Sequence, residues 1–214
     1  MIYQVHHARG SLWARQQAAN KAGCQAYCEQ HLNSIGGDNR RHINYAMAIC
    51  DANASEASKD WARTYTRVVS ETFGHPDRGV LVYPGRGSYN VRFLRCPAIL
   101  LEPGFISCPE FADVIRTGEG VDALAGCLVK SIRLCFPEPS AGLIGLSAGH
   151  AYRDKPDPGA PFYDKGQADT DPKFDDETEL NIAIVDAAAE MLTSGFDPRP
   201  TEPSPPPSDP NPSA

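Results

Sequence analysis

The chain has 214 residues, 41% hydrophobic and 22% charged, so it can bury one good core and has the composition of a globular protein. Its formal net charge of −7, without a basic stripe, excludes a general nucleic-acid binder, because no cluster of cations is present to neutralise phosphates. No run approaches the roughly 18 apolar residues of a membrane span. Residues 1–12 include His6, His7 and Arg9 rather than the apolar core of a signal peptide.

Strands and helices alternate along most of the chain. In chain order the patterns predict a strand at 2–7, a helix at 11–22, a strand at 24–31, a loop at 35–54 with room for a short helix, a helix at 56–73, strands at 79–82, 89–94 and 98–101, helices at 109–115 and 121–135, a strand at 143–146, a polar loop at 151–175 and a helix at 176–193. This alternation predicts an α/β fold, in three α/β/α layers around a central mixed sheet.

The domain organisation follows from composition. We expect residues 1–195 to form one folded domain, whereas residues 196–214 contain eight prolines and almost nothing apolar. Such a tail cannot bury enough surface to offset its ordering entropy, so we expect it to be disordered or polyproline-like. A linker to another module and a simple solvated tail are both compatible with it. The seven cysteines lack paired C-x-x-C spacing, and we expect free thiols buried as small hydrophobes in a reducing compartment.

Three titratable side chains end predicted strands. His31, Glu102 and His150 each follow an apolar segment, and the carboxyl ends of strands in an open α/β sheet are where ligands collect. Glu177 stands in the first turn of the last helix, and Asn181 lies four residues later on the same helical face. Acidic residues are common at helix starts for capping alone, so Asp176 and Glu179 compete with Glu177 on sequence grounds.

This residue set predicts a hydrolytic zinc centre. Catalytic zinc takes three protein ligands and keeps one position open for an activated water molecule. His31, His150 and Glu177 suit the ligand role, because two neutral imidazoles and one carboxylate leave the ion with a net positive charge. Glu102 suits the role of general base, which accepts the proton of the water and passes it to the leaving amine.

The chain resembles the zinc-dependent N-acetylmuramoyl-L-alanine amidases of the Amidase_3 type. The segments that carry the resemblance are Gly149-His150, 157–160 (Asp-Pro-Gly-Ala), 177–181 (Glu-x-x-x-Asn), Arg9, 12–20, 30–33 (Gln-His-Leu-Asn), 78–80 and 97–107. The resemblance implies His31, His150 and Glu177 as zinc ligands, with Glu102 at the catalytic position. The family spacing from Glu177 to Asn181 favours Glu177 over its acidic neighbours, and Asn181, Arg9 and Asn20 would support the site.

The matching segments stand in a different order from the family's. The family's first strand and helix correspond to residues 143–195, which come last here. We therefore predict a circular permutation, with termini opened between the helix ending near Gly195 and the strand starting near Ile2. Residues 137–142 would bridge the former ends as a short polar surface loop.

The resemblance implies a peptidoglycan hydrolase that cleaves the amide bond between N-acetylmuramic acid and the L-alanine of the stem peptide. Zinc is the implied cofactor and bacterial peptidoglycan the implied partner, and loop 151–175 would shape the substrate groove. We expect a phage-type lysin or a cell-wall remodelling enzyme that stays in the cytoplasm until its release to the wall or periplasm. Two alternatives remain open: a zinc peptidase or other amidohydrolase on the same scaffold, and a non-catalytic wall-binding module.

Overall fold

The computed structural model describes residues 2–35, 42–85, 87–137, 142–151, 159 and 176–195. Several predicted segments lie wholly or largely outside the described residues: the tail 196–214, most of the loop 151–175, and positions 138–141 of the bridge 137–142. Of the segment 157–160, only Gly159 is described.

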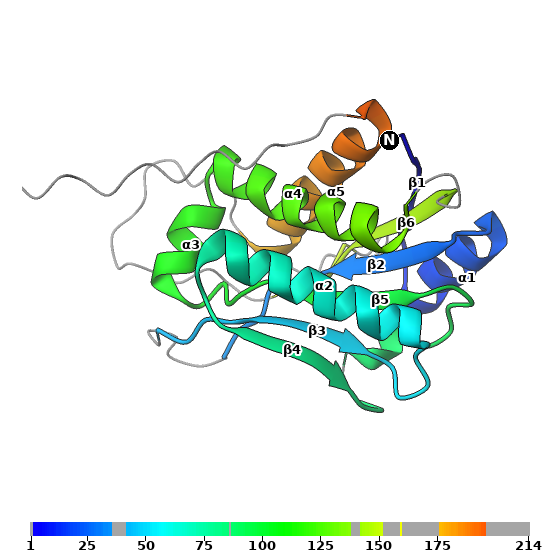
Figure 1. Cartoon of the computed structure of the whole chain (residues 1–214), viewed down its shortest axis with the longest axis horizontal. Coiled ribbons are helices and arrows are strands. Elements are labelled where there is room, and N and C mark those ends of the chain that lie inside the picture. The colour runs from blue at the N-terminus through cyan, green and yellow to red at the C-terminus, as the bar shows by residue number, and fades with distance from the viewer. Residues whose placement is uncertain are drawn as a thin grey trace, which may run out of the picture.

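A six-stranded mixed sheet forms the centre of the molecule (Figure 1). Its strands are β1 (Gln4–His7), β2 (Ala26–Gln30), β3 (Ala46–Cys50), β4 (Asp77–Val82), β5 (Ala98–Glu102) and β6 (Leu143–Ala148). Their spatial order is β1-β6-β2-β5-β3-β4, and every neighbouring pair is parallel except β3 and β5. The last strand in sequence, β6, therefore lies inside the sheet between β1 and β2.

Helices cover both faces of the sheet, which confirms the predicted three-layer α/β/α fold (Figure 1). The helices are α1 (Leu12–Ala22), α2 (Glu56–Phe73), α3 (Pro109–Ile115), α4 (Gly118–Cys135) and α5 (Glu177–Ser194), with a short 3-10 helix η1 (Ser88–Asn90). The helices α2, α3, α4 and α5 pack in one core with Cys28 of β2. Because side chains alternate along a strand, Tyr27 faces the other, smaller core, which contains Ala19 of α1.

Capping residues explain why the helix bounds were predictable. Ser11, Ser55 and Asp176 each accept a hydrogen bond from the backbone N–H three residues later, which satisfies a donor at the helix start. Gly23 and Gly195 end α1 and α5 in the left-handed conformation, with φ of 76° and 71°. These signals are local, so they can be read without the tertiary structure.

Two sequence predictions were wrong. The predicted strand at 89–94 is instead η1 followed by a turn. The backbone of this segment forms hydrogen bonds with a side chain of α1. Gln16 donates to the Tyr89 carbonyl and accepts from the Phe93 N–H. The predicted loop at 35–54 contains the strand β3, whose apolar residues pair with β4 and β5. Both differences arise from partners that are distant in sequence.

The described cysteines are free thiols, five of them buried (Cys24, Cys28, Cys50, Cys108 and Cys127). Burial raises the pKa of the Cys127 thiol to about 11, so it is uncharged at neutral pH and acts as a core side chain. Among the helices of the described ranges, none has the combination of length and apolar character that crossing a membrane requires.

Trp61 offers a test of the helical layer. It is fully buried in α2, its indole N–H donates to the Ser131 hydroxyl of α4 at 3.0 Å, and its ring meets Phe136 edge-on. We expect Trp61→Ala to lower the free energy of unfolding by about 3–5 kcal/mol, measured by denaturant titration followed by circular dichroism. Trp13→Ala is the matched control. Trp13 is 59% exposed and contacts Phe93, so its loss should cost no more than about 1 kcal/mol. Equal losses would contradict this account.

Candidate metal centre

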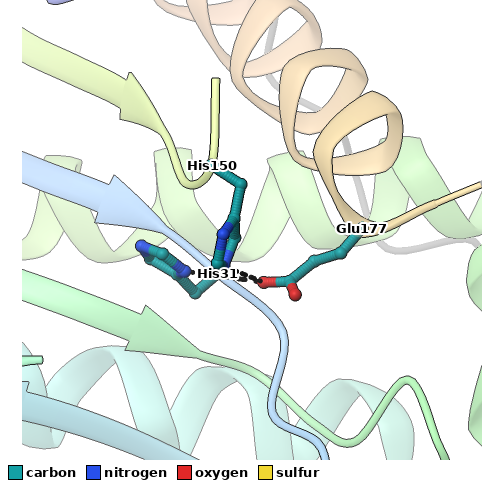
Figure 2. A group of neighbouring side chains, drawn as sticks. All are labelled: His31, His150 and Glu177. Atoms are coloured by element: carbon teal, nitrogen blue, oxygen red, sulfur yellow. Dashed lines mark ion pairs between the residues drawn. The ribbon is translucent and has the colours of Figure 1, made fainter. Parts of the chain in front are cut away.

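Two neighbouring strands bring His31 and His150 together (Figure 2). The parallel register of β2 and β6 sets Gln30 beside Ala148, and the Gly149 N–H donates to the Gln30 carbonyl at 2.7 Å. The two histidines therefore follow the carboxyl ends of adjacent strands. Their rings lie edge to face with centroids 4.9 Å apart.

His150 has an unusual backbone conformation. Its φ of 59° makes it the one non-glycine residue with positive φ among the described residues. A left-handed conformation costs a non-glycine residue roughly 1–3 kcal/mol and is found mainly at functional sites. Here it belongs to the tight turn after β6 from which the imidazole reaches Glu177.

Glu177 completes the group from the start of α5 (Figure 2). One carboxylate oxygen, Oε1, lies 3.5 Å from His31 Nδ1 and 3.4 Å from His150 Nε2. The same oxygen accepts from the Leu32 N–H at 3.0 Å and from the Asn181 side-chain amide at 3.4 Å. The residue is only 2% exposed. The predicted supporting residue Asn181 thus holds the carboxylate that faces both rings.

Asp176 and Glu179, the other acidic residues at the start of α5, do not contact the two histidines in the same way. Asp176 caps α5 by accepting from the Glu179 N–H at 3.0 Å, and Glu179 is exposed. Neither belongs to the group formed by the two histidines and Glu177. Of these three carboxylates, that of Glu177 is the one that lies beside both histidines.

The cluster is electrostatically coupled. Burial opposes the charge on Glu177, but hydrogen bonds and positive charge from His150 and His31 hold its pKa well below the usual range. Burial would lower the pKa of His31, yet its hydrogen bonds to Glu177 and Glu29 outweigh that effect and raise it to about 10. A buried carboxylate thus already faces positive charge, which a metal cation can supply in place of protons.

The donor set fits zinc. Two imidazole nitrogens and one carboxylate oxygen lie within 4.8 Å of one another, with His31 and Glu177 buried and His150 partly exposed. Ligand atoms about 2.0–2.2 Å from a tetrahedral zinc ion are about 3.4 Å from each other. The separations of 3.5 and 3.4 Å between Glu177 and the two rings match that geometry. His31, His150 and Glu177 would therefore hold the ion.

Glu102 lies next to this group without belonging to it. It is the last residue of β5, and the register that pairs Gln30 with Leu101 sets it alongside His31. Its negative charge contributes to the raised pKa of His31. Glu102 is only partly buried and does not belong to the group of three possible ligands.

The two remaining predicted site residues lie outside the cluster. Arg9 is exposed and lines a cavity of about 540 Å³, which also includes Ala148 and Ala151 on either side of His150. Asn20 donates to the Phe93 carbonyl and accepts from the Arg95 N–H, so it fixes the segment after η1.

Sequence reasoning missed Glu29, whose carboxylate lies 2.9 Å from His31 Nε2. It precedes His31 by two residues and therefore shares its face of the strand. The sequence signal that could have identified Glu29 was an acidic residue within the predicted strand 24–31. The role of Gly149 was also missed: a Cβ there would lie 2.4–2.6 Å from three atoms of the His31 ring.

Gly149→Ala tests the close approach to His31. Because the added methyl group would displace the imidazole, we expect the zinc affinity to fall by about tenfold or more. Losses of that size follow when the groups that orient a metal ligand are changed. The affinity is measured by competition with a chromophoric chelator.

Gly120→Ala, in the first turn of α4, is the matched control. Its Cβ would meet backbone atoms of Val114 and Ile115 instead of the histidine. It should lower thermal stability by overpacking and leave zinc affinity unchanged. Unchanged zinc affinity in Gly149→Ala would contradict the proposed clash.

The chain is similar in sequence to a known protein family. The profile of the N-acetylmuramoyl-L-alanine amidase family Amidase_3 matches residues 3–133. No curated protein sequence matches the chain.

Several solved structures are similar in fold. An N-acetylmuramoyl-L-alanine amidase from Clostridium difficile 630 has a TM-score of 0.52 and 24% identity over 60% of this chain and 67% of its own. The CwlD amidase from Clostridioides difficile, solved in complex with the GerS lipoprotein, has a TM-score of 0.50 and 16% identity over 58% and 60%.

The catalytic domain of CwlV, an N-acetylmuramoyl-L-alanine amidase from Bacillus (Paenibacillus) polymyxa var. colistinus, has a TM-score of 0.45 and 23% identity over 58% and 64%. The chain thus spans about two thirds or less of the length of these proteins. Because the family profile covers more than half of the sequence, the chain belongs to the Amidase_3 family of N-acetylmuramoyl-L-alanine amidases.

Proposed function

We propose that the protein is a zinc-dependent peptidoglycan hydrolase that cleaves the amide bond between N-acetylmuramic acid and L-alanine. The observation that carries the proposal is the single Glu177 oxygen lying 3.4–3.5 Å from nitrogens of His31 and His150. Family membership supplies the reaction class.

Each residue has a distinct role in this proposal. His31, His150 and Glu177 would hold a zinc ion, which would supply a Lewis acid to polarise the amide carbonyl and to lower the pKa of a water molecule. Glu102, beside His31 at the end of β5, accepts a proton from the attacking water and delivers it to the leaving amine. Asn181 and the Leu32 N–H keep the Glu177 oxygen directed at the two imidazoles.

The cavity beside His150 would hold part of the substrate. Its lining includes the apolar side chains of Leu146, Ile182 and Val185, together with the cation of Arg9 and the carboxylate of Asp186. A stem peptide combines small apolar side chains with carboxylates, so this lining suits it. The net charge of −7 supports a peptide or glycan partner over nucleic acid.

We also propose that the domain is circularly permuted. The family match ends at residue 133, before β6 and α5, which carry His150 and Glu177. The end of α5 nevertheless meets the start of β1, because the Tyr3 N–H donates to the Leu192 carbonyl at 3.0 Å. A chain could therefore run from α5 directly into β1 with little rearrangement.

Digestion of purified sacculi tests the reaction. We expect the protein with zinc to release stem peptides and leave free muramoyl lactyl groups, identified by mass spectrometry of the products. New ends only between amino acids would instead identify a zinc peptidase. A metal-free protein that binds sacculi without cutting them would identify a wall-binding module.

Substitutions distinguish the proposed zinc ligands from the proposed general base. We expect Glu102→Ala to bind zinc normally but to lose hydrolysis by about 10²–10⁴-fold, because a general base contributes that much. His31→Ala and His150→Ala should lose both zinc and hydrolysis. His42→Ala, at an exposed position where His42 pairs with Glu110, is the control and should change neither. A fully active Glu102→Ala protein would show that the assigned base is wrong.

Reordering the chain tests the permutation. A protein that runs from 142 to 195, then through a short Gly/Ser linker into 2–137, should fold and bind zinc within about threefold of the natural order, since adjacent termini tolerate relinking. Circular dichroism and chelator competition measure the two properties. A reordered chain that cannot fold would contradict the inferred relation between the two orders.

A further inference from the structure

Behind the candidate metal centre lies a second buried carboxylate, Glu29. It is 1% exposed, and its Oε1 lies 2.9 Å from Nε2 of His31. That nitrogen is on the opposite side of the ring from Nδ1, which faces Glu177. The His31 ring therefore lies between two acids, one on each nitrogen.

Glu29 is held by donors from three other positions. Arg15 Nη1 of α1 lies 3.3 Å from Oε1, and the Asn90 side-chain amide of η1 donates to the same oxygen. The Tyr27 hydroxyl donates to Oε2 at 3.3 Å. Arg15 is itself fully buried and also donates to the Ser147 hydroxyl. Because an arginine stays charged even when buried, its ion pair keeps Glu29 in the carboxylate form.

The charge on Glu29 decides which His31 nitrogen carries the proton. A carboxylate can only accept hydrogen bonds, so the contact at 2.9 Å requires an N–H at Nε2. A histidine binds a metal as the neutral imidazole, which has one N–H, so in the metal-bound form Nδ1 is the nitrogen left with its lone pair. Nδ1 is the nitrogen that lies 3.5 Å from Glu177 Oε1.

We propose that Glu29 is a positioning residue that holds His31 as the Nε2–H tautomer, directs Nδ1 at the metal, and thereby sets the zinc affinity of the centre. The inference rests on the proposed function, because it concerns the same metal site. Carboxylates that bind the far nitrogen of a metal-bound histidine fix the orientation of the ring and make it a stronger ligand.

The arrangement also links α1 to the metal centre. Arg15 of α1 contacts Glu29 and the β6 groups Ser147 Oγ and Ala148 O, the last two at 2.9 Å each. The Arg15 guanidinium thus connects the carboxyl ends of β2 and β6, the two strands that His31 and His150 follow. Glu177 approaches from α5, which packs in the larger core with α4. Both helical layers therefore contribute side chains that orient His31.

The main test is Glu29→Gln, which keeps the shape but removes the charge. We expect the zinc dissociation constant, measured by competition with a chromophoric chelator, to rise by about 10- to 100-fold. Hydrolysis should fall at low zinc and recover as zinc is raised. Glu29→Asp keeps the charge and should recover part of the lost affinity. An unchanged zinc affinity in Glu29→Gln would overturn the inference.

Ser131→Ala is the matched control. It removes a buried hydrogen-bond partner of Trp61 between α2 and α4 and leaves His31, Glu29 and Arg15 untouched. A role for Glu29 in folding alone predicts that both variants change thermal stability and neither changes zinc affinity. We expect Ser131→Ala to lower stability and to bind zinc as the wild type does. Equal weakening of zinc binding by both variants would overturn the inference.

A measurement on the wild type keeps the test independent of whether Glu29→Gln folds. In ¹H–¹⁵N spectra of the zinc-loaded protein, His31 should show a protonated Nε2 and a metal-bound Nδ1. The opposite assignment would overturn the inference. Zinc binding with this tautomer but no cleavage of sacculi would refute only the proposed function, whereas a wild type that binds no zinc would refute both.

Discussion

The structure depends on one buried carboxylate oxygen, Glu177 Oε1. A buried charge is costly unless it is paired and hydrogen-bonded, and this oxygen meets His31, His150, the Leu32 N–H and Asn181. Those partners come from β2, from the turn after β6 and from α5 itself. Forming the cluster therefore requires the central strands and the last helix to be in register at the same time. A cation that replaces the protons of the imidazoles would stabilise the same arrangement.

The position of β6 makes this convergence possible. Because β6 pairs with β2 in parallel, the residues that follow both strands emerge at the same edge of the sheet. The family match ends before β6, yet the turn after β6 and the start of α5 supply two of the three possible metal ligands. These segments lie outside the matched region in sequence, although β6 lies inside the sheet and α5 packs in the larger core beside it.

A carboxylate faces each ring nitrogen of His31. Glu177 approaches Nδ1 from α5, and Glu29, held by Arg15 and Asn90, approaches Nε2. The Gly149 backbone passes so close to the imidazole that no Cβ fits between them. The ring is therefore confined by charge on two sides and by backbone on a third. Such confinement favours one orientation and one tautomer, which is how protein surroundings tune a metal ligand.

From sequence alone, the elements with local signals were predictable. Ser55 and Gly23 mark a helix start and a helix end, and the apolar run of β5 marks a central strand, because caps and burial patterns act within a few residues. The family motifs also singled out His31, His150 and Glu177. Only the tertiary structure decided that β3 is a strand, that Glu177 rather than Asp176 faces the histidines, and that Glu29 lies behind His31. Each of these depends on pairing between segments distant in sequence, and such pairing leaves no local pattern to read.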